Sequence, residues 1–156
     1  MKIRRIECNN KKKGFRITTF SGRVFWFPYA NATPQPTADN RVHEVYADPD
    51  FGREALTFVL ESGDEGSVHL DDVLEYNEDP KHMSNIALYR LTVEARKRVE
   101  ESPLSKREIC RRIGTSPTQF YRLLDTANYK KSMNQLVALL AAVECNVDFV
   151  VKERDE

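Results

Sequence analysis

Residues 104–124 read LSKREICRRIGTSPTQFYRLL, and this stretch decides the fold of the second half of the chain. Two serines in it each precede a Glu or Gln by three positions, Ser105 before Glu108 and Ser116 before Gln119. In such a pair the serine hydroxyl accepts the backbone N–H three residues on, and the Glu or Gln reaches back to the N–H of the serine. Each pair therefore predicts a helix start. Gly114 lies between the pairs and predicts the end of the first helix. Two short helices around a glycine turn form a helix-turn-helix, which favours DNA reading as the function.

The segments on either side of this motif also predict helices. Ser132 precedes Gln135 by three positions and is predicted to cap a last helix. Upstream, Thr92 is predicted to cap a helix that runs to about Glu101, where Ser102-Pro103 ends it because proline disfavours a helical residue before it. Residues 86–91 either extend this helix or form a short strand. The apolar residues of Val147–Val151 predict a short terminal strand.

The first half of the chain is predicted to be β-rich. Short runs of aromatic and β-branched residues alternate there with turn residues, which is typical of hairpins. The segment 31–41 contains Pro34 and Pro36 and is predicted to be a loop. The chain therefore divides near Pro80 into a β-rich domain, residues 1–80, and a helical domain, residues 81–156. The predicted strands are Ile3–Cys8, Phe15–Phe20, Val24–Phe27, Leu56–Glu61 and Ser67–Leu70.

Composition excludes several classes of protein. The 156 residues are 40% hydrophobic, enough for a packed core, and no apolar run approaches the roughly 18–20 residues of a membrane helix. The charged start, Met-Lys-Ile-Arg-Arg, lacks the apolar stretch of a secretion signal, so we expect a cytoplasmic protein without a membrane partner. The three cysteines and three histidines share no ligand spacing, so no metal or other cofactor is expected. No nucleophile motif or acid–base pair supports an enzyme.

The formal net charge of zero conceals an asymmetry along the chain. Residues 1–80 hold 10 Lys/Arg against 14 Asp/Glu, and residues 81–156 hold 14 against 10. Between Arg90 and Lys131 the count is 11 against 5. Any surface helix carries charge, but this excess coincides with the helix-turn-helix pattern and favours a surface that faces phosphates.

The stretch from Leu104 to Leu124 resembles the helix-turn-helix of lambda-repressor-like (Cro and XRE-type) regulators. Those proteins show a Leu-Ser/Thr-polar-polar-Glu-Leu-Ala start, a glycine four positions after the alanine and a Ser-rich entry to the second helix. This chain has Cys110 where alanine is usual and Thr115 where a branched apolar residue is usual. The resemblance implies an α+β protein in which a β-rich domain is followed by an all-α lambda-repressor-like helix-turn-helix domain.

The resemblance also implies roles for individual residues, because the second helix of such a motif enters the major groove by its N-terminal residues. Thr118, Gln119 and Arg122 are the expected base readers, and Gln119 has a second possible role in capping its own helix. Arg111 and Arg112 are interpreted as solvated charges. The expected phosphate contacts are Lys106, Arg107, Tyr129, Lys130 and Lys131.

The sequence thus predicts a transcriptional regulator that binds double-stranded DNA as a homodimer. The dimer would form through the β-rich half or through paired Val147–Val151 strands. The alternative is an antitoxin-like interaction module whose β-rich half sequesters a protein partner. The two hypotheses share a fold, and the sequence does not separate them.

Overall fold

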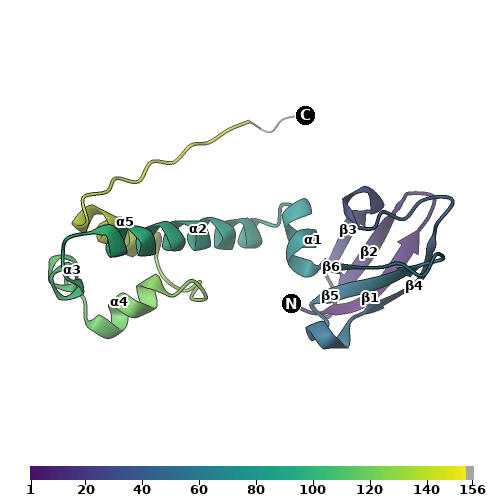
Figure 1. Cartoon of the computed structure of the whole chain (residues 1–156), viewed down its shortest axis with the longest axis horizontal. Coiled ribbons are helices and arrows are strands. Elements are labelled where there is room, and N and C mark those ends of the chain that lie inside the picture. Colours follow the sequence, from purple (N-terminus) through teal and green to yellow (C-terminus); the bar gives the residue numbers. More distant parts are fainter. Residues whose placement is uncertain (154–156) are drawn as a thin grey trace. The chain divides into compact units, whose positions relative to one another are not determined.

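The computed structural model describes residues 1–153. The chain divides into two compact units, Met1–Met83 and Ser84–Glu156. Figure 1 shows the strands and α1 in the first unit and the last helices in the second. The boundary between the units falls inside helix α2 (Pro80–Glu101).

The first unit contains two three-stranded antiparallel sheets. The strand order is β1-β2-β3 in one sheet and β4-β5-β6 in the other, so each sheet is a meander of consecutive strands. The hairpins β2–β3 and β5–β6 confirm the two predicted hairpins, with Gly22 and Gly63 at positive φ in their turns. The strands are β1 (Ile3–Asn9), β2 (Gly14–Thr19), β3 (Val24–Pro28), β4 (Val42–Ala47), β5 (Ala55–Leu60) and β6 (Glu65–His69).

One hydrophobic core joins the two sheets. Side chains from both sheets, such as Phe15 and Phe58, are completely buried, and their ring centroids are 5.4 Å apart. Helix α1 (Leu70–Tyr76) contributes Leu70, Val73 and Leu74 to the same core. Two short 3-10 helices, η1 (Tyr29–Asn31) and η2 (Pro49–Phe51), lie between strands.

Arg53 ties the sheets together through the backbone. Its guanidinium donates to the carbonyl oxygens of Ile3, at 2.9 Å, and Arg4, at 3.1 Å, and its own carbonyl accepts from the Ile3 N–H at 2.8 Å. The guanidinium also lies 5.5 Å from the centre of the Phe20 ring. Arg53 makes these contacts from a left-handed backbone conformation with φ of 63°. Such a φ is uncommon for a residue with a side chain, so the contacts must offset its cost.

The only tryptophan, Trp26, packs against the backbone of the neighbouring strand. A Cβ atom placed on Gly14 would lie 2.1 Å from Cζ2 of the indole, far inside van der Waals contact. Glycine is therefore required at position 14 for the indole to lie flat on strand β2.

The second unit is built around a second core. Helix α2 contributes Leu88, Ala95 and Val99 to it, and Phe120 and Leu136 are completely buried there. This core lies among α2, α3 (Lys106–Ile113), α4 (Pro117–Leu124) and α5 (Met133–Ala142). None of the helices in the described part of the chain combines the length and hydropathy needed to cross a membrane.

The predicted fold class is wrong. We expected a β-rich domain followed by an all-α lambda-repressor-like helix-turn-helix domain, but the chain is an α+β mixture in which helical segments are interleaved with strands. The helical turns η1 and η2 interrupt the strands, and α1 completes the core of the first unit. Asp71 and Asp72 lie in the first turn of α1, where carboxylates are favourable. The strand β4 was not predicted.

Two other predictions from the second half are also wrong. Thr92 does not begin a helix: it is completely buried inside α2, and its hydroxyl donates to the Leu88 carbonyl at 2.7 Å. The helix begins at Pro80, where the Asp79 carboxylate accepts the His82 N–H at 3.2 Å as a cap. The residues Val147–Val151 form no strand in the single chain, and the Val151 side chain is 95% exposed.

We expect Arg53→Ala to lower the free energy of unfolding of the first unit by about 2 kcal/mol, because two hydrogen bonds from a charged donor are lost. Arg4→Ala is the matched control, since the Arg4 side chain is exposed and has no partner among residues 1–153. Thermal unfolding followed by the fluorescence of Trp26, which lies in the first unit, measures both. Equal melting temperatures for the two variants would contradict the role assigned to Arg53.

Candidate functional site

Helices α3 and α4 are joined by a tight turn. Gly114 adopts the left-handed conformation, with φ of 66° and ψ of 39°, and its N–H bonds back to the Arg111 carbonyl. The Thr115 N–H donates to the Cys110 carbonyl at 3.0 Å. These two bonds satisfy carbonyls that the end of α3 leaves free, and only three residues separate α3 from α4. Cys110 is buried in the core of the second unit, as a small side chain between the helices.

Ser105, Ser116 and Ser132 lie at the N-caps of α3, α4 and α5. Their hydroxyls accept the N–H of Glu108 at 3.1 Å, of Gln119 at 3.2 Å and of Gln135 at 3.2 Å, respectively. The sequence also predicts a reciprocal bond in each pair, but the structure has it only at α5, where the Ser132 N–H donates to Gln135 at 3.4 Å.

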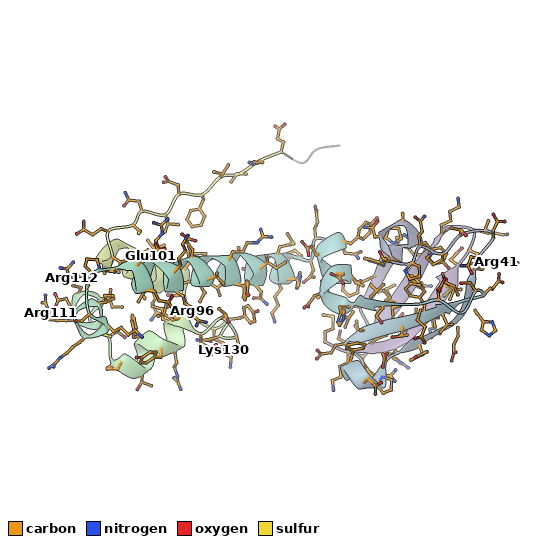
Figure 2. The ribbon with its side chains drawn as sticks, viewed as in Figure 1. Arg41, Arg96, Glu101, Arg111, Arg112 and Lys130 are labelled. Atoms are coloured by element: carbon orange, nitrogen blue, oxygen red, sulfur yellow. The ribbon has the colours of Figure 1, made fainter. Side chains whose placement is uncertain are left out.

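Glu108 does not reach back to Ser105 because two arginines hold its carboxylate. Arg111 contacts both carboxylate oxygens, at 2.5 and 2.9 Å, and Arg112 contacts one at 3.3 Å. These hydrogen bonds lower the pKa of Glu108 to about 2. Arg112 also donates to the Ala142 carbonyl at 3.4 Å, at the end of α5. Figure 2 shows both arginines on α3 at the margin of the second unit.

The exposed face of α4 carries the three expected base readers. Thr118, Gln119 and Arg122 are all exposed, on the side of the helix opposite to Phe120 and Leu123. Gln119 does not cap its own helix, and within residues 1–153 neither its carboxamide nor the Arg122 guanidinium has a hydrogen-bond partner. Both groups are therefore free to bind a ligand.

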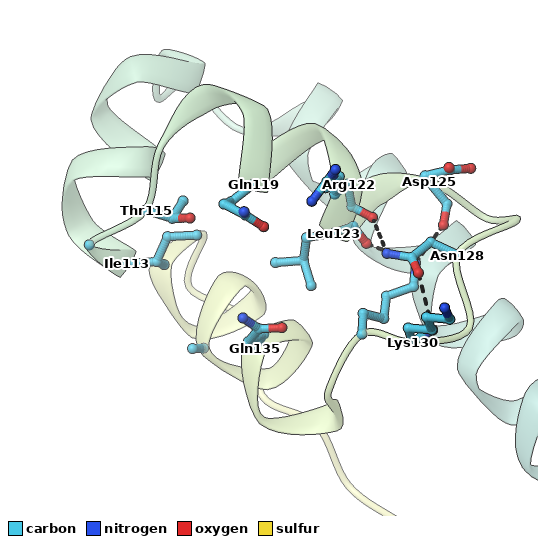
Figure 3. A pocket seen from close by; sticks show the side chains of 12 residues that line it. Ile113, Thr115, Gln119, Arg122, Leu123, Asp125, Asn128, Lys130 and Gln135 are labelled. Carbon is cyan, nitrogen blue, oxygen red and sulfur yellow. Dashed lines mark hydrogen bonds between the residues drawn. The ribbon is translucent and has the colours of Figure 1, made fainter.

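A cleft of about 690 Å³ runs between α4 and the start of α5. Gln119 and Arg122 line it from α4, Gln135 lines it from α5, and Lys130 lines it from the connecting loop (Figure 3). Asp125 supplies the one carboxylate of the lining. The α4–α5 cleft therefore presents the Gln119 carboxamide and the Arg122 guanidinium, neither of which is hydrogen-bonded within residues 1–153. Its lining also has an excess of positive charge.

The Lys131 side chain folds back onto the end of α4 and does not extend into solvent. Its ammonium donates to the carbonyls of Leu123 at 2.8 Å and Asp125 at 2.7 Å, which α4 leaves free at its end. Partial burial lowers the pKa of Lys131, while the charge of Asp125 opposes the shift. The Asn128 side chain adds a third bond, from its amide to the Arg122 carbonyl at 3.1 Å. The loop 125–131 is thereby fixed against the end of α4.

The remaining expected phosphate contacts are spread around α4. Lys130 is exposed on the rim of the α4–α5 cleft, and its backbone N–H bonds to the Asn128 side chain at 3.1 Å. Lys106 lies 5.6 Å from the centre of the Tyr121 ring, on a different side of α4, where a smaller cavity of about 240 Å³ opens. Arg107 and Tyr129 are exposed and line neither of these cavities. The structure thus brings Gln119, Arg122 and Lys130 together.

Sequence reasoning missed the structural roles of Lys131 and Asn128. The pattern Asp125-Thr-Ala-Asn128 could have indicated the loop, because Asp and Asn side chains accept backbone N–H groups two residues on. Both do so here: Asp125 accepts from Ala127 at 3.0 Å, and Asn128 accepts from Lys130. No local pattern indicates that the Lys131 ammonium folds back to α4, since that contact depends on the path of the loop.

Across residues 1–153, no group of three or more His, Cys, Asp or Glu side chains is placed to hold a metal ion. Comparisons with protein-family models, with curated proteins and with solved structures give no significant match for this chain. The function is therefore inferred from the chemistry of the residues themselves.

We expect Lys131→Met to lower the free energy of unfolding of the second unit by about 1–2 kcal/mol, because two carbonyls at the end of α4 lose their donor. Lys130→Met, the adjacent and fully solvated lysine, is the control and should change it by less than about 0.5 kcal/mol. Chemical denaturation followed by circular dichroism compares the two. A Lys131→Met protein as stable as Lys130→Met would show that the ammonium does not hold the loop.

The carboxylate of Glu108 predicts a pH-dependent contribution to stability. Its pKa in the folded chain, about 2, lies below the ordinary value of 4.5, so its bonds to Arg111 and Arg112 stabilise the fold above pH 4.5. That contribution is lost as the pH falls towards 2, when the carboxylate becomes protonated. The difference in melting temperature between the unaltered chain and Glu108→Gln should therefore shrink from neutral to acidic pH. A difference that does not vary with pH would contradict this assignment.

Proposed function

We propose that this chain is a sequence-specific DNA-binding regulator that reads the major groove with α4. One observation carries the proposal: the exposed face of α4 presents the side chains of Gln119 and Arg122, without hydrogen-bond partners among residues 1–153, beside a positively charged cleft. The resemblance of residues 104–124 to lambda-repressor-like regulators agrees with this function. The tight α3–α4 turn agrees with it, since the first three residues of α4, Pro117, Thr118 and Gln119, are exposed.

The chemistry of these side chains matches the edges of base pairs. A glutamine carboxamide pairs bidentately with adenine, and an arginine guanidinium pairs bidentately with guanine. An α-helix with its side chains is roughly 10–12 Å across, close to the width of about 12 Å of the major groove. Thr118 and Gln119 lie in the first turn of α4, and Arg122 lies one turn further along the same exposed side. We assign base reading to these three residues.

The flanking cations and one phenol are suited to the DNA backbone. Lys106 and Arg107 lie in the first turn of α3, and Tyr129 and Lys130 lie in the loop that follows α4. Side chains on both sides of a reading helix can contact the phosphates that border the groove. We assign phosphate binding to these four residues. Lys131 is left out of the set because its ammonium bonds to the end of α4.

We expect the regulator to act as a homodimer, since a single reading helix buries little surface on DNA and such modules usually double it by two-fold symmetry. The half-sites would then lie about 34 Å apart, one turn of the double helix. Light scattering of the full chain, alone and with DNA that it binds, measures the oligomeric state. A strictly monomeric mass at high micromolar concentration in both samples would contradict the dimer.

The mechanism is tested by distinguishing residues that contact bases from residues that contact phosphates. Binding sites are first selected from a random DNA pool. Arg122→Ala should then cost about 1–3 kcal/mol on the preferred site and relax the preference at one base position. Lys130→Ala should weaken binding to all sequences alike and lower the salt slope by about one unit, because a phosphate contact releases condensed counterions.

The control is Arg111→Ala, which removes a cation that is already paired with Glu108. It should change affinity for either duplex less than the other two variants. If Arg122→Ala weakened binding to specific and scrambled duplexes equally, Arg122 would contact a phosphate and not a base. If neither Arg122→Ala nor Lys130→Ala altered binding, the α4 face would not contact DNA, and the antitoxin-like hypothesis would take precedence.

A further inference from the structure

A second cavity lies wholly within the first unit, and the DNA-binding proposal does not use it. Its volume is about 390 Å³, and it opens where the β1–β2 turn meets the loop that precedes β4. Its apolar lining consists of Tyr29, which is 4% exposed, the buried Pro36 and the exposed Ala38. Lys11, Lys13 and Arg41 line it as well, and all three are exposed. We call this the Tyr29 pocket.

The Tyr29 pocket is strongly positive. It is lined by three cations, and no Asp or Glu is among the residues that line it. The ammonium groups of Lys11 and Lys13 have no partner in the described residues 1–153, and the nearest acid to Arg41 is Glu61, with Nε and Oε1 3.7 Å apart at the surface. An exposed ion pair of this kind is weak and can exchange for another anion. The Gln35 side chain also lines the pocket without a hydrogen-bond partner in that range.

The walls of the pocket are fixed before any ligand enters. The Asn9 side chain accepts the N–H groups of Lys11 at 3.1 Å and Lys12 at 2.9 Å, which shapes the turn. The Tyr29 N–H donates to the Lys13 carbonyl at 2.9 Å, and the Tyr29 hydroxyl donates to the Asn10 side chain at 3.0 Å. Burial raises the pKa of Tyr29 above its usual range, so the phenol stays neutral and keeps this bond. A pre-formed site reduces the entropy lost on binding.

We propose that the Tyr29 pocket binds a small organic anion, with an apolar part against Ala38 and the accessible atoms of Tyr29 and Pro36, and a phosphate or carboxylate held by Lys11, Lys13 and Arg41. The volume lies in the range of small-molecule sites, which combine apolar walls with a few placed polar groups. No Asp or Glu lines the pocket, so its three cations select for negative charge, and the exposed Ala38 supplies apolar area beside the largely buried Tyr29 and Pro36. This inference is independent of the DNA-binding proposal.

The test is a titration of the ¹⁵N-labelled full chain followed by NMR. The probes are adenosine monophosphate, benzoate, adenosine and inorganic phosphate. We expect saturable shifts of the Lys11, Lys13 and Arg41 amides with one of the two organic anions, at concentrations up to about 10 mM. Adenosine and inorganic phosphate should bind at least about tenfold more weakly, because each lacks one half of the recognised chemistry. Saturation by adenosine monophosphate alone identifies a phosphate as the anionic group, and saturation by benzoate alone identifies a carboxylate.

Two adjacent lysines give a matched pair of variants. Lys11→Gln should weaken binding of the saturating anion by about tenfold, the loss of one charge-assisted contact. Lys12→Gln removes the same charge from the same turn, but Lys12 does not line the pocket, so it should leave the affinity within about twofold. Unchanged dispersion of the other amide signals shows that both variants are folded. Equal weakening by the two variants, binding of inorganic phosphate as tight as that of the organic anion, or no saturation by either organic anion would each overturn the proposal.

Discussion

The candidate site depends on one ammonium group. Lys131 donates to two carbonyls at the end of α4, and these bonds turn the chain back so that α5 begins beside α4. The fixed loop and the packing of α5 in the core of the second unit together bring Gln135 and Lys130 opposite Gln119 and Arg122, and so form the α4–α5 cleft. The end of a helix carries a partial negative charge, so a cation there is favourable in two ways, as a donor and as a charge.

The basic residues of the chain therefore fall into two groups with different physical roles. Some are used within the fold: Arg53 joins the sheets, Arg111 and Arg112 hold Glu108, and Lys131 closes α4. Others, such as Arg122, Lys130 and Lys11, keep free charged groups at the rims of cavities. A count of charges along the sequence does not separate these groups, because the difference is made by which carbonyl or carboxylate lies within reach. The number of basic residues between Arg90 and Lys131 overstates the number of cationic groups that can contact a ligand.

The features that depend on hydrogen bonds between nearby residues were predicted correctly from the sequence. The three serine caps, the left-handed Gly114 and the two hairpins lie where the sequence places them, because each rests on hydrogen bonds between residues a few positions apart. The errors arose where distant contacts decide. Helix α1 and strand β4 carry short apolar patterns that gain their stability from the shared core. The misplaced start of α2 is the exception, because the Asp79 cap and Pro80 that begin this helix are a local signal, and Thr92 lies inside it. Val147–Val151 has the composition of a strand but no neighbouring strand to pair with in the single chain.

The packing of Trp26 on Gly14 has a practical consequence for spectroscopy. Because the chain has one tryptophan and it lies in the first unit, fluorescence excited selectively at tryptophan reports the folding of that unit. Far-ultraviolet circular dichroism is dominated instead by α2, α3, α4 and α5, which hold most of the helical residues. The two optical signals therefore come from different units of the same molecule. Their midpoints, recorded on one sample, measure whether the units unfold together or in sequence.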